Sequence, residues 1–402
     1  MHWQILIALA AGTLFALYLH QYIEWISWIG VLFLQLLKMV IIPLVLTSII
    51  TGVSGIGSAE SLGRLGLKTM SFYIFTSLLA ILLGLFLVNL IQPGIGADLS
   101  LAEKVTSIPA TEQSIGQLLL AAVPENIFRS LSNGDMLPII FFAIIFGFFI
   151  NMVPSRHQKV LNFFFVATYE VMMKITLTVV KLTPLGVFAI IASVTSRYAG
   201  DAHALGLVFS RMGIYMLTVL AGLIIHTFFT LHLTLWGLGR INPFRHFRNM
   251  STPLLTAFST SSSSATLPLT MEAVETKDGV SNKIASFTLP LGATINMNGT
   301  ALYECVAVIF IAQAYGVELN AIQQITVVLT ALLAAVGSAG IPMAGLVMMT
   351  IVLNAVGLPL EGIGLILAVD RLLDMFRTTV NVYGDTCAAV IIAKSEGETL
   401  NV

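Results

Sequence analysis

Long apolar runs joined by short polar segments make up most of this chain. A helix needs roughly 20 residues to cross a bilayer, so runs of that length predict membrane-spanning helices at about 3–21, 25–53, 69–93, 114–153, 160–195 and 204–238. The fourth run is too long for one pass, and a break is expected near Pro124 or Pro138. The pattern predicts an all-α, multi-pass membrane protein whose longest polar linker lies at about 94–113.

Two later segments are apolar but have small or polar residues at their centres. Asn249–Met271 contains the polar run Ser259–Thr266, and Leu319–Leu360 is broken by Gly337–Pro342. Each leg of the first segment has about 11 residues, or roughly 16 Å of helix, which is half of a ~30 Å bilayer core. We therefore interpret both as helical hairpins that enter and leave the membrane on one side. The alternative is that the polar runs are plain loops between ordinary spans.

A helix with a polar centre is expected after each hairpin. The first contains Asn296–Thr300, and the second contains the stripe Asp370–Asp385, whose positions 370, 374, 377, 378, 381 and 385 share one helical face. Two successive units of hairpin and interrupted helix are typical of an inverted repeat that meets at the membrane midplane. With hairpins at about 245–276 and 319–360, two opposed tips would flank one polar site, as in an alternating-access transporter.

Composition supports the membrane assignment and excludes other classes. The 402 residues are 57% hydrophobic and 10% charged, with a mean hydropathy of +0.94, whereas soluble domains carry about 25% charged residues. The net charge of −1 argues against nucleic acid as a partner. Cys305 and Cys387 lie in separate apolar segments and are expected to be free thiols. An enzyme is not expected, because the sequence has no recognisable nucleophile–base pair or metal motif.

The distribution of Lys and Arg orients the chain, because cytoplasmic loops carry an excess of both. With a cytoplasmic N-terminus and six helices before the first hairpin, the inner basic residues are Arg64, Lys68, Arg156, Lys159, Arg240, Arg245, Arg248, Lys277, Lys283 and Lys394. The outer ones are Lys104, Arg129 and Arg197. We therefore expect a multi-pass protein of the cell membrane with both termini in the cytoplasm.

The charged stripe predicts a site for a zwitterion. Charged side chains inside a bilayer are costly, so they mark functional sites. Arg377 can bind a carboxylate through its planar guanidinium, and Asp374, one turn earlier, can hold an ammonium group. Thr378 and Asn381 add neutral hydrogen-bonding groups. The alternative is that Asp374 and Arg377 only neutralise each other, and the preceding pair, Asp370–Arg371, is either an internal ion pair or the outer part of the site.

Other polar groups predict sites for ions. Asp385, Asn381 and Asn296 could supply oxygens to a hard monovalent cation, although a buried, protonated Asp385 is an alternative. Glu304 could carry a proton, because burial favours the neutral form of a carboxyl group; it could instead face water at a helix end.

Two groups of hydroxyl residues are also candidates. Ser262–Ser264 offers hydroxyls and backbone N–H groups at a helix start, which suit a carboxylate. Tyr73, Thr76 and Ser77 form a polar patch in an apolar helix, for which bonding to the preceding helical turn is the ordinary explanation.

Four segments resemble the glutamate transporter family, the dicarboxylate/amino acid:cation symporters: Ser261–Pro268, Gly292–Glu304, Gly340–Gly345 and Asp370–Asp385. The likeness covers essentially the whole chain, with these motifs in the right order. It implies eight transmembrane helices, two re-entrant hairpins, an inverted-repeat elevator fold and a homotrimer in membrane lipid. It also implies a static scaffold of about 1–63 and 114–196, and a moving transport part of about 64–93 and 204–395.

The resemblance also implies the roles of individual residues. Substrate contacts fall on Arg377, Asp374, Thr378, Asn381, Ser263, Thr300 and the backbone of Ile341 and Gly345. A first sodium ion would use Asp385, Asn381, Asn296 and the Gly292 carbonyl, and a second would use carbonyls near Thr294, Met297, Val336 and Ser338. A third would match Tyr73, Thr76, Ser77, Asn296 and Asn298.

Three positions depart from the family's patterns. Asn298 stands where the family has Asp, and a neutral amide offsets less of a cation's lost hydration, so the third sodium is expected to bind weakly or to be replaced. Ser261 and Met375 stand where many members carry an arginine, so Asp374 lacks that arginine as a neighbour, which is expected to alter the affinity or the release rate. Glu304 matches the acidic residue to which animal members assign proton coupling. A carboxylate at 304 and none at 298 together favour a proton-assisted cycle.

These features predict a symporter of L-aspartate or L-glutamate that uses Na⁺, with a proton as a further coupled ion. Arg377 favours an acidic side chain and Asp374 favours an amino acid, because neutral-selective relatives and dicarboxylate carriers lack the respective residue. A neutral amino acid or C4-dicarboxylate symporter of the same family is the nearest alternative. An anion channel or a receptor that does not translocate its ligand is the alternative from another class.

Overall fold

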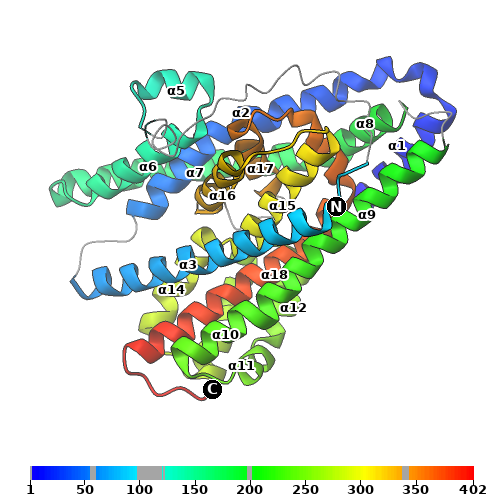
Figure 1. The fold of residues 1–402 in the computed structure, drawn as a ribbon. Helices are drawn as coiled ribbons and strands as arrows, with labels where there is room; N and C mark the ends of the chain where they lie inside the picture. Colours follow the sequence, from blue (N-terminus) through cyan, green and yellow to red (C-terminus); the bar gives the residue numbers. More distant parts are fainter. Residues whose placement is uncertain (1, 55–59, 97–119, 121–122, 197–201, 337–343) are drawn as a thin grey trace.

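The computed structural model describes residues 2–54, 60–96, 120, 123–196, 202–336 and 344–402, and the regular elements in these ranges are all helices (Figure 1). The predicted all-α fold is confirmed at this level. Ser338, Ile341, the predicted break Gly337–Pro342 and most of the 94–113 linker lie outside the described residues.

The first three helices follow the predicted apolar runs. They are α1 (His2–Tyr18), α2 (Glu24–Ser54) and α3 (Glu60–Ile91), with the short 3₁₀ turn η1 (His20–Tyr22) between the first two. α3 begins at Glu60 rather than near residue 69, because the helix continues through the polar residues before the apolar run. Hydropathy locates the apolar part of such a helix and not its end.

The next two runs are each divided. α5 (Ile127–Asn133) ends at Gly134 with φ +78°, and α6 (Met136–Ile150) begins two residues later. The predicted break therefore lies between Pro124 and Pro138. The single helix expected at 160–195 is wrong: α7 (Ser155–Lys181) and α8 (Thr183–Ser196) meet at Leu182. Pro184 lies in the first turn of α8, where its missing N–H costs nothing.

A long helix with two π-helical parts leads to the first hairpin. It runs through α9 (Ala202–Ile225), η3 (His226–Leu231), α10 (His232–Thr234) and η4 (Leu235–Gly239). A turn follows, and α11 (Pro243–Asn249) begins after Asn242, whose side chain accepts from the N–H groups of Phe244 and Arg245. This capping satisfies donors that the start of a helix leaves without partners.

Both predicted hairpins are pairs of packed helices within the described ranges. α12 (Ser251–Thr260) and α13 (Ser263–Ala273) are joined at Ser261 and Ser262, and α16 (Ala321–Val336) packs against α17 (Ala344–Ala355). Ser261 has φ +51°, and the Ser262 side chain accepts from the N–H of Ala265 at 3.2 Å. A π-helical turn, η5 (Val274–Asp278), ends the first hairpin, and the 3₁₀ turn η6 (Leu360–Gly362) follows the second.

The two polar-centred helices differ from each other. α14 (Asn282–Ile295) and α15 (Asn298–Ala314) are separated by Asn296 and Met297, whose backbone is not helical. The expectation that the second is also interrupted is wrong, because α18 runs unbroken from Ile363 to Ser395. The charged residues of its stripe bond to one another along the helix, so they do not need to leave the helical conformation.

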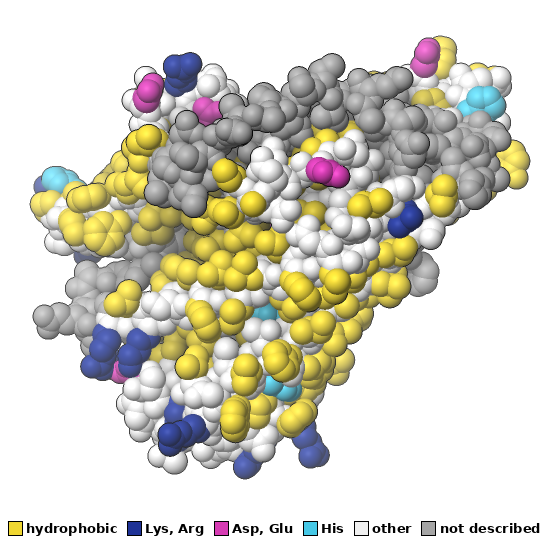
Figure 2. Space-filling view, in the orientation of Figure 1, with side chains coloured by type: hydrophobic (Ala, Val, Ile, Leu, Met, Phe, Trp, Pro, Cys, Tyr) yellow, Lys and Arg dark blue, Asp and Glu magenta, His cyan; other side chains and the backbone are white. Residues whose placement is uncertain are grey.

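The core forms around α15 and α18, which lie in the middle of the helices in Figure 1. α15 is buried along almost its whole length and packs against α3, α9, α16, α17 and α18. Large apolar side chains cover much of the outer face seen in Figure 2, as expected for a surface that contacts lipid.

Four described helical stretches are long and apolar enough to cross a membrane, namely Arg64–Ile91, Ser155–Val179, Ser210–Gly239 and Asn282–Ala314. The structure therefore supports a membrane protein without establishing the predicted number of spans.

Candidate functional site

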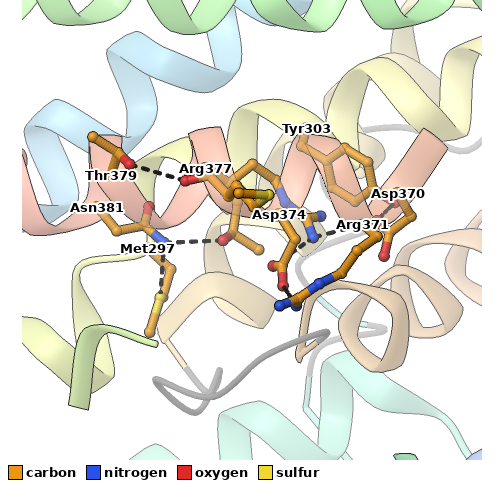
Figure 3. Close-up of polar contacts among 10 residues, drawn as sticks. Met297, Tyr303, Asp370, Arg371, Asp374, Arg377, Thr379 and Asn381 are labelled. Carbon is orange, nitrogen blue, oxygen red and sulfur yellow. Dashed lines mark hydrogen bonds and ion pairs between the residues drawn. The ribbon is translucent and has the colours of Figure 1, made fainter. Parts of the chain in front are cut away.

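The polar face of α18 meets the break between α14 and α15, as in the close-up of Figure 3. The stripe residues Asp370, Asp374, Arg377, Thr378, Asn381 and Asp385 are all buried. Their burial agrees with the prediction that these positions share one face. Because α18 is continuous, its 3.6-residue period alone is enough to align them.

Arg377 lies at the centre of this face and is fully buried. Its Nη2 is 2.8 Å from Asp374 Oδ1 and 3.2 Å from an oxygen of Asp370. The Tyr303 ring lies 3.7 Å from the guanidinium carbon, in cation–π contact. Nε and Nη1 of Arg377 have no hydrogen-bond partner among the described residues. Two buried donors are thus available for an anion. Leaving buried donors without a hydrogen-bond partner is costly.

Asp374 accepts from two arginines at once. Arg371 Nη1 lies 3.1 Å from Oδ2, while Arg377 Nη2 lies 2.8 Å from Oδ1 (Figure 3). Arg371, from the preceding turn, thus places a second cation beside Asp374 even though positions 261 and 375 hold no arginine. Asp370 forms an ion pair with Arg377 and also accepts from the Tyr303 hydroxyl at 2.6 Å.

Asn381 joins α18 to the start of α15. Its Oδ1 accepts from the Gly299 N–H at 2.8 Å, and its Nδ2 donates to Thr300 Oγ1 at 3.1 Å and to the Met297 sulfur at 3.1 Å. Ser263, at the start of α13, is also buried. The structure thus brings Asn381 and Thr300 together, as a shared pocket requires.

Oxygen atoms gather around Asp385. Its Oδ1 accepts from Asn296 Nδ2 at 2.8 Å, and the Tyr73 hydroxyl donates to the Thr288 carbonyl at 2.8 Å. A Cβ added at Gly292 would lie 2.5 Å from Asp385 Oδ1 and 2.6 Å from the Tyr73 hydroxyl, so only glycine fits there. Asn296 Oδ1 is buried and has no hydrogen-bond partner among the residues that the structure describes. A carboxylate, a buried unpaired amide oxygen and a nearby phenol oxygen fit a sodium ion, which prefers oxygen ligands.

The side-chain amide of Asn298 is oriented with its oxygen bonded to the backbone, which does not suit a third cation. Its Oδ1 accepts from the Gly299 N–H at 2.9 Å, which assigns the other end of the amide as NH₂. Nδ2 faces Gly384, where an added Cβ would lie only 2.5 Å away, and no described residue accepts from it. Thr76, another expected ligand, donates to the Phe72 carbonyl at 3.0 Å. A donor therefore stands where a cation would need an oxygen.

The remaining expected residues are placed as follows. Ser77 is buried on α3, Thr294 lies in the last turn of α14, Met297 lies in the break, and Val336 ends α16. Glu304 is fully buried, with no hydrogen-bond partner for either oxygen among the described residues. The alternative that Glu304 faces water at a helix end is therefore wrong, because it lies within α15, which is buried on all sides.

Two features were missed in the sequence. Tyr303 lies three residues after Thr300 and so near it on the α15 surface, a spacing that could have indicated its contact with Arg377. The buried pair His246–Asp278, with 2.7 Å between Nδ1 and Oδ2, joins two short elements far apart in sequence, and no local pattern indicates it.

Comparisons with known proteins agree with this geometry. The family described as the sodium:dicarboxylate symporter family matches residues 1–395. The proton/sodium-glutamate symport protein of Bacillus caldotenax is 36% identical over 365 residues, covering 88% of this chain and 83% of that protein. The proton/glutamate-aspartate symporter of Escherichia coli (strain K12) is 36% identical over 416 residues, covering 98% and 92%. Excitatory amino acid transporter 3 of Homo sapiens is 37% identical over 400 residues, covering 87% and 75%.

Proposed function

Because this chain belongs to the sodium:dicarboxylate symporter family, we propose that it is a secondary active symporter of L-aspartate and L-glutamate. Sodium drives uptake, and a proton is a further coupled ion. The relatives named as glutamate or aspartate symporters cover most of the chain, which supports an acidic amino acid as the substrate and transport rather than enzymatic catalysis as the activity.

The buried guanidinium of Arg377 is the observation that carries this proposal. Asp370 and Asp374 both contact Nη2, whereas Nε and Nη1 have no hydrogen-bond partner among the described residues. A side-chain carboxylate of the substrate accepts a charge-assisted hydrogen bond from Nη1. Asp374 receives the substrate's ammonium group, and Thr378, Asn381, Thr300 and Ser263 supply neutral contacts. The backbone of Ile341 and Gly345 completes the pocket from the second hairpin.

Sodium is held by Asp385 together with Asn296, Asn381 and the Gly292 carbonyl. The unpaired Asn296 Oδ1 beside Asp385 supports this assignment. A second sodium uses carbonyls near Thr294, Met297, Val336 and Ser338. A third, at Tyr73, Thr76, Ser77, Asn296 and Asn298, is bound weakly or is replaced. The bound cation supplies positive charge that offsets the carboxylates of the site.

Glu304 carries the coupled proton. A carboxyl group that has no hydrogen-bond partner and no water contact is far less costly to bury when it is neutral, and both of its oxygens are in that position. Protonation therefore accompanies closure of the site, and deprotonation accompanies release.

Movement follows the elevator scheme of the family. A scaffold of about 1–63 and 114–196 stays fixed in the membrane as part of a homotrimer. The transport part, about 64–93 and 204–395, carries the site across the membrane, and the hairpins at about 245–276 and 319–360 close it from opposite sides. The protein crosses the cell membrane eight times, so that both termini lie in the cytoplasm.

Uptake into proteoliposomes tests this function. Labelled L-aspartate is supplied with an inward sodium gradient, and unlabelled glutamate, serine and succinate are added as competitors. We expect concentrative uptake that needs sodium and is inhibited by glutamate far more than by the other two. Inhibition mainly by serine or succinate would identify a neutral amino acid or dicarboxylate symporter. Flux that only equilibrates would indicate a channel, and binding without uptake would indicate a receptor.

A variant pair connects this result to the site. Arg377→Gln removes the proposed carboxylate ligand and should abolish acidic amino acid uptake. Arg156→Gln removes an exposed arginine at the start of α7 and should leave uptake unchanged. Equal activity of the two variants would contradict the assignment of Arg377.

A further inference from the structure

A buried, hydrogen-bonded His–Asp pair lies near the cation site and takes no part in the mechanism above. His246 of α11 and Asp278 at the end of η5 are both fully buried, with 2.7 Å between Nδ1 and Oδ2. Asn249 Nδ2 donates to the other oxygen, Oδ1, at 2.7 Å. α11 and η5 flank the two legs of the first hairpin, so the pair closes the hairpin at its base.

The same imidazole also reaches α18. His246 Nε2 lies 3.0 Å from Thr386 Oγ1, and this hydroxyl is also 2.8 Å from the Tyr383 carbonyl oxygen, to which it can donate. The ring of Tyr383 lies beside the imidazole, with ring centroids 5.5 Å apart. Thr386 directly follows Asp385, whose carboxylate accepts from Asn296.

Stability alone does not account for this arrangement. Replacing both partners of a buried hydrogen bond by apolar groups of the same shape can be nearly neutral for stability, so apolar residues of similar size would serve the core equally well. The order Asp–His–hydroxyl also occurs in acyl-transfer enzymes, but Thr386 is fully buried and its hydroxyl has the Tyr383 carbonyl as an acceptor. A substrate could not reach it.

The effect that remains is geometric. Thr386 is held against α11, so α18 can neither rotate nor slide there without breaking a hydrogen bond to a buried partner, which is costly. Asp385 directly precedes Thr386 on the same rigid helix. The same contact therefore fixes the direction of the Asp385 carboxylate toward Asn296.

We propose that His246, held by Asp278, is a positioning residue that fixes Asp385 for cation binding through Thr386. The inference rests on the proposed sodium site at Asp385 and adds residues that do not touch the ion. Loss of the contact weakens sodium binding and leaves the other parts of the site intact.

Sodium binding by the purified protein tests the proposal without transport. A ligand that binds only the folded state raises the unfolding temperature in a way that reports its affinity. The unfolding temperature is measured without substrate as sodium chloride replaces choline chloride at constant ionic strength. Thr386→Val removes the hydroxyl with little change in shape, and one lost hydrogen bond predicts a sodium Kd about threefold to tenfold higher.

Three further variants separate positioning from general damage. Thr386→Ser retains the hydroxyl and should restore the original sodium Kd, and His246→Gln should weaken binding as Thr386→Val does. Thr218→Val is the matched control, because the Thr218 hydroxyl is buried and bonds to the Ile214 carbonyl of its own helix at 2.8 Å. It should leave the sodium Kd unchanged.

The outcomes distinguish this inference from the proposed function. An unchanged sodium Kd in Thr386→Val and His246→Gln, or an equal loss in Thr218→Val, would overturn the positioning role while leaving sodium coupling intact. A lack of any sodium-dependent stabilisation in the unaltered protein would overturn both.

Discussion

Gly345 lies so close to Arg377 that a Cβ at position 345 would be 2.5 Å from Nη1. We predict that Gly345→Ala lowers the affinity for L-aspartate by about tenfold or more, because the methyl group would occupy the side of the guanidinium that the substrate carboxylate needs. Calorimetric titration with aspartate measures the change. Gly213→Ala is the control, since no atom lies within 4 Å of the added Cβ there. Equal affinities in the two variants would contradict the placement of the carboxylate.

In the proposed site, Arg371 would compete with the substrate's ammonium group for Asp374. Its side chain is 13% exposed, whereas that of Arg377 is 1% exposed, so Arg371 is the partner that can withdraw toward water. Arg371→Gln removes this cation from Asp374 and should tighten aspartate binding about threefold, within the range measured for partly exposed ion pairs. Succinate has no ammonium group, so its binding should not tighten. Weaker aspartate binding in the variant would show that Arg371 supports the site instead.

The sequence predicted the helices and the first hairpin because their signals are local. Apolar runs mark the helices, and the polar run Ser259–Thr266 contains the turn at Ser261. The continuity of α18 could not be predicted, because it depends on how charged side chains bond to one another once the chain has folded. The same limit applies to the site, where Asp374 meets a second cation only through a particular rotamer of Arg371.

Contacts between distant segments were the least predictable. His246 and Asp278 are 32 residues apart, and each belongs to a short element with no strong periodicity. A lone His or Asp in such a segment is ordinary, and only the packing of α11 against η5 gives the pair its meaning.

Restoring a carboxylate at position 298 should create a stronger cation site. In Asn298→Asp one oxygen can keep the Gly299 N–H bond, and the other replaces the NH₂ group that now faces Gly384. We expect aspartate uptake to become more steeply dependent on sodium, with the Hill coefficient raised by about one if a further ion is bound. Asn320→Asp adds the same charge at an exposed position, where the side chain can still accept from the Gln323 N–H, and should have no effect. An unchanged sodium dependence in Asn298→Asp would argue against a latent third site.

Glu396 connects the end of α18 to the start of α3. One oxygen lies 2.5 Å from Lys68 Nζ and the other lies 2.6 Å from Arg64 Nη2. The hydrogen bond from Lys68, and after it the one from Arg64, lowers the pKa of Glu396. A lowered folded-state pKa stabilises the fold above the unfolded value near 4.5, and this stabilisation is lost as the pH falls through the folded value. The basic partners are 67% and 37% exposed, so the contribution is below about 1 kcal/mol.

Thermal unfolding of Glu396→Gln checks this dependence. The variant should unfold at a lower temperature than the unaltered protein at about pH 7. The difference should shrink as the pH falls from about 5 toward about 3, because protonation removes the charge of Glu396. Glu24→Gln, at an exposed position at the start of α2, should match the unaltered protein at both pH values. A difference that persists at the lower pH would show that charge is not its cause.

Glu304 gives a test of proton coupling that is independent of substrate affinity. Its carboxyl group is buried without a hydrogen-bond partner among the described residues, so the neutral form is the one that the closed site tolerates. Glu304→Gln imitates that form permanently. We expect aspartate-driven acidification of the vesicle interior to disappear, while exchange of labelled for unlabelled aspartate stays within about threefold of the original rate.

A pH-sensitive dye enclosed in the vesicles reports the acidification. Glu318→Gln, which removes an exposed carboxylate beyond the end of α15, is the matched control and should acidify normally. Proton movement that persists in Glu304→Gln would show that another group carries the proton. Loss of exchange together with acidification would show that Glu304 is needed for the transport step itself, because a neutral residue of the same size would then fail even when no net proton movement is required.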